Sequence, residues 1–261
     1  MSADPPGRFD VVAELDVPHR PDLDPVRRQV DALVPLTRHV LVPDNHTGRA
    51  AVSGVAVTVA ARGAGATTVT VVLNARDRNR LGLRRDLLGL LALGVHDVLL
   101  LRGDRPDDPA QDGPLTVRAM RDEARDLAAE HGTTLRVGVV ADLGRDLVAW
   151  KRDADAVYLA PAFSAERVVA WRARHTDLGV PVRAGVLVPT GPRMARSVAD
   201  AMGLALPTGL LDALADDPDA GVDAACEHVL ALRASGAVDG VHLVAVSRAA
   251  AVARRLAPLL D

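Results

Sequence analysis

Short runs rich in valine and leucine recur along the chain, each flanked by polar or turn residues. This is the pattern of strands buried on both faces of a parallel sheet. The runs lie at residues 9–15, 39–42, 68–73, 97–101, 135–140, 156–160, 182–186 and 240–244. Helical patterns lie between them, at residues 25–36, 80–93, 115–130, 165–178, 192–202, 210–214, 222–235 and 248–260. The chain therefore alternates strands with helices.

Eight strands alternating with helices over 261 residues predict a single (β/α)₈ barrel domain spanning residues 1–261. The alternative is an open, doubly wound sheet, which normally carries a glycine-rich phosphate turn after its first strand. Here that turn, at residues 16–21, reads Asp-Val-Pro-His-Arg-Pro and contains no glycine. The pattern favours the barrel.

Composition narrows the function classes. Lys+Arg 31 against Asp+Glu 34 gives a net charge of −3, which offers no basic surface for nucleic acid. The single cysteine, Cys226, excludes an internal disulfide, and no His/Asp/Glu set has the spacing of a metal site, so no metal is expected. No apolar run is long enough to span a bilayer and no secretory signal is visible, so a cytoplasmic protein is expected.

The first strand carries a carboxylate in an apolar run, Val11-Val12-Ala13-Glu14-Leu15. Strand alternation points Val12 and Glu14 to the same face. A carboxyl group inside a barrel should have a raised pKa, which suits a general acid near neutral pH. The alternative is a solvated residue on the rim.

The second and third strands also end in polar residues. Asp44 and Asn45 could line a ligand pocket, and they are equally typical of a turn. Residues 74–80 read Asn-Ala-Arg-Asp-Arg-Asn-Arg beside a predicted helix start, a setting that favours a phosphate or pyrophosphate. The alternative is a salt-bridge cluster with Asp77 and Asp86.

The fourth and eighth strands add further candidates. Gly103 would let the backbone approach a flat ligand closely, and Asp104 could stabilise a developing cation or cap the next turn. Arg248 could bind an anionic tail, although Ser247 before it is equally typical of a helix N-cap.

These motifs resemble the methylenetetrahydrofolate reductase family. The specific part is residues 72–106, which contain the 74–80 segment, Leu-Arg-Arg-Asp-Leu-Leu-Gly at 83–89 and Leu-Arg-Gly-Asp at 101–104. Val-Ala-Glu-Leu at 12–15 also matches. Weaker matches are Ala-Gly-Val at 184–186, Leu-Pro at 206–207 and Gly-Val-His-Leu at 240–243.

The resemblance implies a (β/α)₈ barrel that binds FAD and reduces methylene-tetrahydrofolate to methyl-tetrahydrofolate with NADH or NADPH. Glu14 would be the general acid, and Asp104 would stabilise the cationic intermediate of the folate. A folate-like small molecule and a homo-oligomer are the expected partners. The resemblance implies flavin contacts at Asn74, Arg76, Asp77, Arg78, Asn79, Arg102, Gly103, Asp146, Lys151 and Arg152. Substrate contacts are expected at Asp44, Asn45, Met194 and Arg248.

The chain departs from the family where the pterin is recognised. The family's Thr-Gln pair after the sixth strand falls at Leu159-Ala160, a second glutamine falls at Met194, and an aromatic residue falls at Val198. A related flavoenzyme with a different iminium-like or heterocyclic substrate is therefore the alternative function. Two further alternative functions are a barrel that binds a ligand without catalysis, and an aldolase that uses Lys151.

Overall fold

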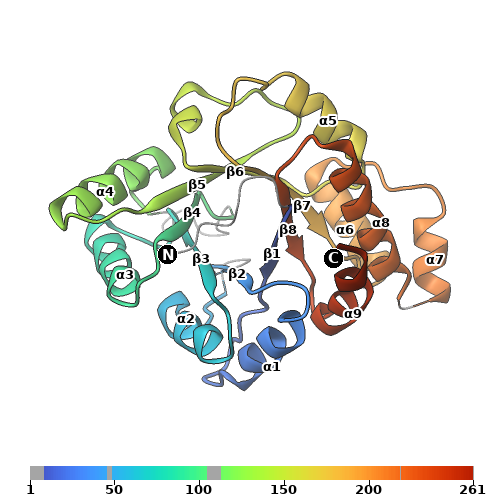
Figure 1. The fold of residues 1–261 in the computed structure, drawn as a ribbon, viewed down its shortest axis with the longest axis horizontal. Coiled ribbons are helices and arrows are strands. Elements are labelled where there is room, and N and C mark those ends of the chain that lie inside the picture. The colour runs from blue at the N-terminus through green and yellow to red at the C-terminus, as the bar shows by residue number, and fades with distance from the viewer. Residues whose placement is uncertain (1–8, 46–48, 105–112, 218, 261) are drawn as a thin grey trace.

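The strands close into a parallel barrel. The computed structural model describes residues 9–45, 49–104, 113–217 and 219–260. Each strand pairs in parallel with the next along the chain, and β8 pairs back onto β1, which confirms the predicted (β/α)₈ fold (Figure 1). The strands are β1 Asp10–Glu14, β2 His39–Val42, β3 Thr68–Asn74, β4 Asp97–Leu101, β5 Arg136–Ala141, β6 Ala156–Leu159, β7 Val182–Leu187 and β8 Gly240–Val244.

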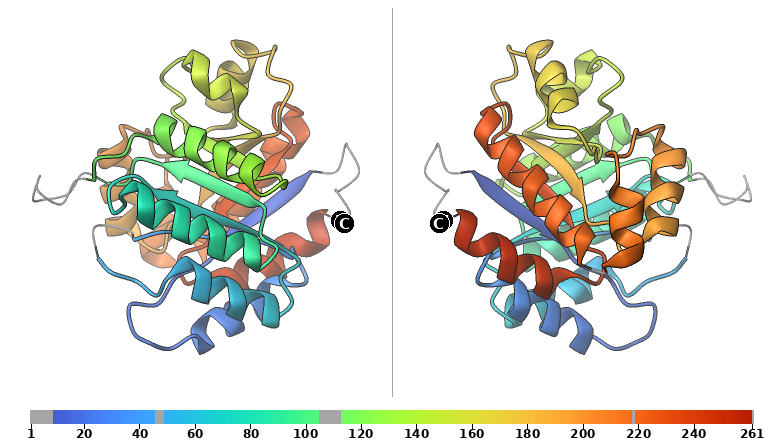
Figure 2. Two further views of the ribbon diagram at one scale, coloured as in Figure 1. Left: turned by 90° about the vertical axis from the view of Figure 1, so that its left-hand side faces the viewer. Right: turned by 90° about the vertical axis from the view of Figure 1, so that its right-hand side faces the viewer.

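Helices surround the barrel on its outside (Figure 2). Ser53, Asn79, Thr116 and Ser164 each begin a helix by accepting a hydrogen bond from the backbone N–H three residues on, which satisfies a donor that the helix itself leaves open. The helices are α1 Asp24–Leu33, α2 Gly54–Gly63, α3 Arg80–Ala92, α4 Val117–Glu130, α5 Ala165–Ala173, α6 Pro192–Met202, α7 Leu210–Asp216, α8 Ala220–Ser235 and α9 Ala249–Leu260.

Two connections differ from the sequence prediction. Helix α2 was not predicted, because its Val- and Ala-rich run shows little contrast between an apolar and a polar face. The cap at Ser53 and packing against the barrel stabilise the helix there. Between β5 and β6 the chain forms the short 3₁₀ helix η3, Ala149–Asp153, where the sequence showed no helical period.

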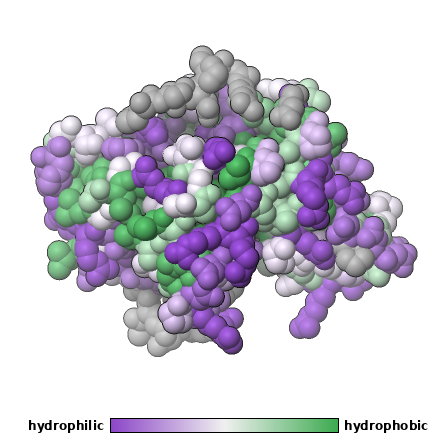
Figure 3. All heavy atoms as spheres, turned by 60° about the horizontal axis from the view of Figure 1, so that its bottom comes forward, coloured by the Kyte–Doolittle hydropathy of each residue, from purple (hydrophilic) through white to green (hydrophobic). Residues whose placement is uncertain are grey.

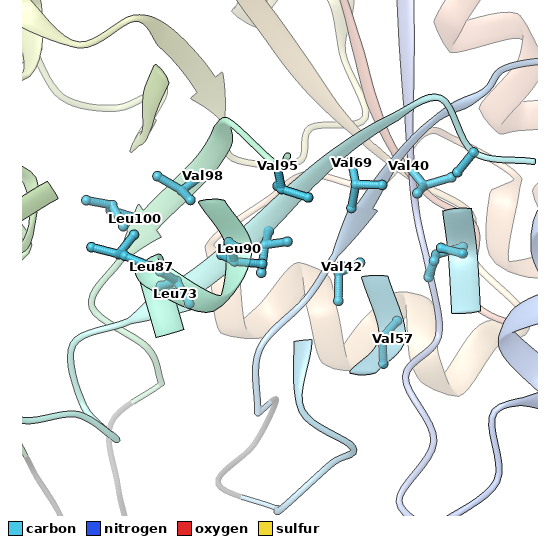
Figure 4. Packing of buried hydrophobic residues seen from close by; sticks show 14 of the residues in the cluster. Val40, Val42, Val57, Val69, Leu73, Leu87, Leu90, Val95, Val98 and Leu100 are labelled. Atoms are coloured by element: carbon cyan, nitrogen blue, oxygen red, sulfur yellow. The ribbon is translucent and has the colours of Figure 1, made fainter. Parts of the chain in front are cut away.

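The outer face of the barrel packs against the helices. Figure 4 shows Val42 and Leu73 on the strands facing Val57 of α2 and Leu87 and Leu90 of α3. These side chains are at most 2% exposed. Burial of this kind stabilises the fold by about 1.5–3 kcal/mol for each large apolar side chain.

The inside of the barrel holds a smaller apolar layer. Val12, Leu41, Val72 and Leu99 come from β1 to β4, and Tyr158 of β6 completes the cluster. Gly138 makes room for the tyrosine, because a Cβ atom there would lie 3.0 Å from the Tyr158 ring. The layer fills the inside of the barrel, so a ligand bound within the barrel can lie only above it, at the strand ends.

A polar floor lies below this layer, where the strands begin. Asp10 Oδ2 lies 2.8 Å from Arg183 Nη2 and 3.4 Å from His39 Nδ1. The His39 ring reaches Thr70 Oγ1 at 2.9 Å. Burial alone would raise the pKa of Asp10, but the hydrogen bond to His39 and the charges of His39 and Arg183 outweigh it and lower that pKa to about 2.

The outer surface mixes residue types. Figure 3 shows hydrophilic and hydrophobic residues interspersed over the face that carries the lower helices of Figure 1. Among the described residues, no helix is both long and apolar enough to cross a membrane.

We predict that Asp10→Asn lowers the free energy of unfolding by about 2 kcal/mol at pH 7, because the substitution removes the carboxylate that pairs with Arg183 and His39. The folded-state pKa of Asp10, about 2, is below the ordinary value of 3.8, so the stabilisation is present above pH 4 and is lost as the pH falls toward 2. Urea unfolding at pH 7 and pH 3 measures the difference. Asp24→Asn, at a carboxylate 67% exposed, is the control and should change stability far less. Equal stability of Asp10→Asn and wild type at pH 7 would contradict the prediction.

Candidate functional site

Glu14 is the last residue of β1 and stands at the mouth of the barrel. Its side chain is 14% exposed. Glu14 Oε2 lies 2.9 Å from His242 Nε2 on β8, a hydrogen-bond distance. The structure therefore couples the predicted general acid to an imidazole that comes from the other end of the chain.

His242 is itself packed against a second buried ring. Its imidazole meets Tyr158 edge to face, with the ring centroids 5.8 Å apart and an interplanar angle of 78°. Tyr158 is 3% exposed, and burial raises the pKa of its phenol. The guanidinium carbon of Arg183 lies 5.4 Å from the centre of the tyrosine ring.

The end of β3 is joined to the loop after β2 through one carboxylate. Asp44 Oδ2 accepts from the Asn74 backbone at 2.9 Å and from the Asn74 side chain at 2.8 Å. Arg78 pairs with the same oxygen and also with Asp86 Oδ2, at 3.0 Å. These contacts bring together Asp44, Asn74 and Arg78 from two neighbouring strand ends.

A second carboxylate organises the rest of this loop. Asp77 accepts from Arg76 Nε at 2.7 Å and from the side-chain amides of Asn45 and Asn74, each at 2.9 Å. Arg76 also donates to the backbone oxygen of Asp104 at 3.1 Å, which joins the β3 loop to the β4 loop. Asn79 caps α3 directly after this cluster.

The charges of this segment are matched inside the protein. The hydrogen bond from Arg76 holds the pKa of Asp77 well below its usual range. Burial would lower the pKa of Arg78, but the carboxylates of Asp44 and Asp86 raise it. Arg76 is 3% exposed and Arg78 14%. The segment thus forms the salt-bridge cluster considered as an alternative above, and a role in phosphate binding stays a prediction.

The loop after β4 lies beside this cluster. Arg102 and Asp104 are exposed, and Gly103 between them has φ +87°. A Cβ atom on Gly103 would lie 3.2 Å from Asn74 Cβ and 3.3 Å from Arg76 Cβ. Glycine is therefore required here by both the backbone conformation and the close approach of the β3 loop.

A cavity of about 560 Å³ opens next to the β3 loop. Its lining includes the predicted ligand residues Asp44, Asn45, Asp77, Arg78 and Asn79. Apolar side chains of β3, α2 and α3 form its floor, so it lies between the barrel wall and these helices. Its size is within the usual range for small-molecule sites. Neither Glu14 nor Asp104 belongs to the described lining.

The predicted flavin contacts after β5 form a separate group. Lys151 Nζ donates to the Val140 backbone oxygen at 2.6 Å, and burial lowers the pKa of this lysine. Arg152 pairs with Asp177 at 2.7 Å, and Asp146, 81% exposed, pairs with Arg174 at 3.4 Å. The contacts of all three are with β5 or with the end of α5.

The last two predicted substrate residues lie on different elements. Met194 is half-buried in the first turn of α6. Arg248 Nη1 lies 3.3 Å from Asp219, just before α8. Val246 and Ser247 before it have φ 38° and 58°, a conformation that side chains rarely adopt. The Ser247 N–H donates to Asp16 Oδ2 at 2.7 Å, which ties this strained turn to the loop after β1.

Sequence reasoning did not single out His242 or Tyr158 as functional residues. Strand alternation from Gly240 does place His242 on the inner face, but only barrel closure puts it beside Glu14. Within the described residues, no three His, Cys, Asp or Glu side chains gather in a way that could hold a metal ion.

Comparison with known proteins shows the fold of this chain and no family. No protein-family model matches the chain, and no curated protein matches it in sequence. A protein from Clostridium thermocellum that binds two copies of 5-methyl-5,6,7,8-tetrahydrofolic acid superposes with a TM-score of 0.65. The two are 10% identical, and the match covers 97% of this chain and 96% of that one.

Two oxidoreductases are also similar in structure. An F420-dependent secondary alcohol dehydrogenase, solved with an F420-acetone adduct, has a TM-score of 0.60 at 9% identity and covers 97% of this chain and 99% of its own. The EDTA monooxygenase from Chelativorans sp. BNC1 has a TM-score of 0.57 at 12% identity and covers 97% and 93%. This chain shares their barrel fold. Identities this low carry no conclusion about substrate or cofactor.

We predict that Gly103→Ala destabilises the protein by about 1–3 kcal/mol, because alanine at this φ is strained and crowds Asn74 and Arg76. Urea unfolding measures the change. Gly63→Ala is the matched control, since a Cβ atom there meets no atom within 4 Å. Equal effects of the two substitutions would mean that the β3 and β4 loops do not require glycine between them.

Proposed function

We propose that this protein is a flavin-dependent oxidoreductase that reduces 5,10-methylenetetrahydrofolate to 5-methyltetrahydrofolate, with NADH or NADPH as the reductant. The observation that carries the proposal is the placement of Glu14 at the barrel mouth, largely buried and 2.9 Å from His242. Active sites of this fold lie at that rim. The folate-binding structural neighbour is an example of this barrel fold with a bound folate.

Glu14 would supply the proton that opens the five-membered ring of the folate. A general acid must stand within hydrogen-bond reach of the group that it protonates, and a carboxyl group at the mouth can do so. Asp104, exposed on the loop after β4, would stabilise the positive charge that develops on the substrate.

The residues at the mouth suit a flat cofactor. Gly103 lets the β3 and β4 loops pack closely at this rim, and exposed Arg102 beside it suits an anionic group. When bound and reduced by NADH or NADPH, FAD would supply the hydride that a C=N bond accepts. Arg76 and Arg78 are paired to carboxylates, so we assign them the task of shaping the loop and the cavity beside it. Lys151 and Arg152, on the β5 to β6 connection, remain candidates for the adenosine end.

A second candidate function follows from the end of β6. Ala160 and Met194 stand where amide side chains would recognise a pterin, and neither can form those hydrogen bonds. The chain after β6 also lies close over β7, since a Cβ atom on Gly185 would lie 2.7 Å from Pro161 N. This favours a related flavoenzyme with a different iminium-like or heterocyclic substrate.

The absorption spectrum of the purified protein, followed by anaerobic titration, separates these candidates. Bleaching of a flavin spectrum by methyl-tetrahydrofolate supports the reductase. A flavin spectrum that responds to NADH or NADPH but not to the folate supports the second candidate. A colourless protein that takes up no added FAD contradicts both.

We predict that Glu14→Gln abolishes turnover with the folate and leaves reduction of the flavin by the pyridine nucleotide nearly intact, because only the folate step needs a proton donor. Stopped-flow measurement of each half-reaction tests this. Equal loss of both half-reactions would argue against a proton-donor role for Glu14.

We predict that Arg78→Ala weakens flavin retention, because Asp44 and Asp86 lose their buried counter-charge and the cavity wall loosens. Equilibrium dialysis with FAD gives the affinity. Arg85→Ala is the control: Arg85 also pairs with Asp86 and also lines the cavity, but it is 80% exposed. Unchanged affinity in Arg78→Ala would remove Arg78 from the cofactor site.

A further inference from the structure

We propose that Tyr158 is a positioning residue for Glu14, acting through His242. The proposal rests on the function proposed above, in which Glu14 is the proton donor. It assigns a task to a buried tyrosine that the proposed chemistry does not otherwise use.

Tyr158 is fixed from several sides inside the barrel. The Thr70 side chain of β3 lies near its hydroxyl, so the Tyr158 side chain crosses the barrel from β6. Gly138 of β5 leaves just enough room for one edge of the ring, and Arg183 of β7 lies over its face. Thr70 is in turn held by His39, which belongs to the polar floor. The ring is therefore a rigid part of the barrel.

His242 lies between two neighbouring strands. Its register partners on these strands are Val12 of β1 and Gly185 of β7. Gly185 has no side chain, and the Leu159 oxygen and Pro161 of the chain after β6 occupy the space that a Cβ atom there would take. The edge-to-face contact with Tyr158 supports the imidazole from inside the barrel.

The position of His242 restricts the position of Glu14. A glutamate has several rotamers of similar energy, and a hydrogen bond to a fixed partner favours one. Among the described residues, the charged and titratable groups near the imidazole include Glu14 from β1 and Tyr158 from β6, with Arg183 of β7 over the tyrosine ring. Loss of the Tyr158 ring should thus loosen His242 and weaken its hold on the Glu14 carboxyl group.

The first test needs neither cofactor nor substrate. Protein labelled with ¹⁵N-histidine is compared as wild type, Tyr158→Leu and Tyr158→Phe by NMR, and His242→Gln identifies the His242 signals among the 8 histidines. In wild type we expect His242 to show a single hydrogen-bonded tautomer. In Tyr158→Leu we expect the averaged signals of a mobile imidazole, and in Tyr158→Phe, which keeps the ring, a pattern close to wild type.

The second test is the folate half-reaction. Tyr158→Leu should slow it by about tenfold or more, with little change in substrate affinity, because a small misplacement of a reacting group is costly in rate. Tyr158→Phe should lose much less. Val72→Ala, which removes apolar side-chain volume from the same cluster, is the control for a general loosening of the barrel. It should leave the His242 signals as in wild type.

The outcomes separate the two proposals. An unchanged His242 spectrum in Tyr158→Leu overturns the positioning role, whatever the enzyme turns over. The same spectral change in Val72→Ala also overturns it, since the effect would then be general. If wild type shows no folate chemistry but Tyr158→Leu alone releases His242, the reductase assignment fails and the support of His242 by Tyr158 stands.

Discussion

The pairing of β8 with β1 is the interaction on which the candidate site depends. It joins residues 228 positions apart and sets His242 next to Glu14. Because all strands run in parallel, closure also gathers every strand end on one rim. The strained turn after β8 and the loop after β1 become neighbours through this closure.

Inside the barrel, charge and apolar packing alternate in layers. The floor of Asp10, His39 and Arg183 is polar, the middle layer around Tyr158 is apolar, and Glu14 with His242 lies above. Each buried charge has an opposite charge or a hydrogen-bond partner, which is the condition for keeping it in a low-dielectric interior. Tyr158 joins the layers, because its ring lies against Arg183 of the floor and meets His242 above.

The β3 loop shows why residue type alone does not reveal a role. Arg76 and Arg78 beside a helix start are the residues expected around a phosphate, yet here they neutralise Asp44, Asp77 and Asp86. The sequence indicated pairing with Asp77 and Asp86 as an alternative, but Asp44 was not among the expected partners. Asp44 and Arg78 are 34 residues apart and meet only because β2 and β3 are adjacent.

The sequence by itself determined the barrel, since the period of its Val- and Leu-rich runs is a local property that parallel strands require. It also placed Glu14, Asn74 and Asp104 at strand ends, because alternation and strand length are local too. Tertiary structure decided the rest. Helix α2 forms through its cap and its contact with the barrel, and the Tyr158, His242 and Glu14 contacts arise from strands distant in sequence. Side-chain partners across a closed sheet depend on register and closure, which no single segment of the sequence encodes.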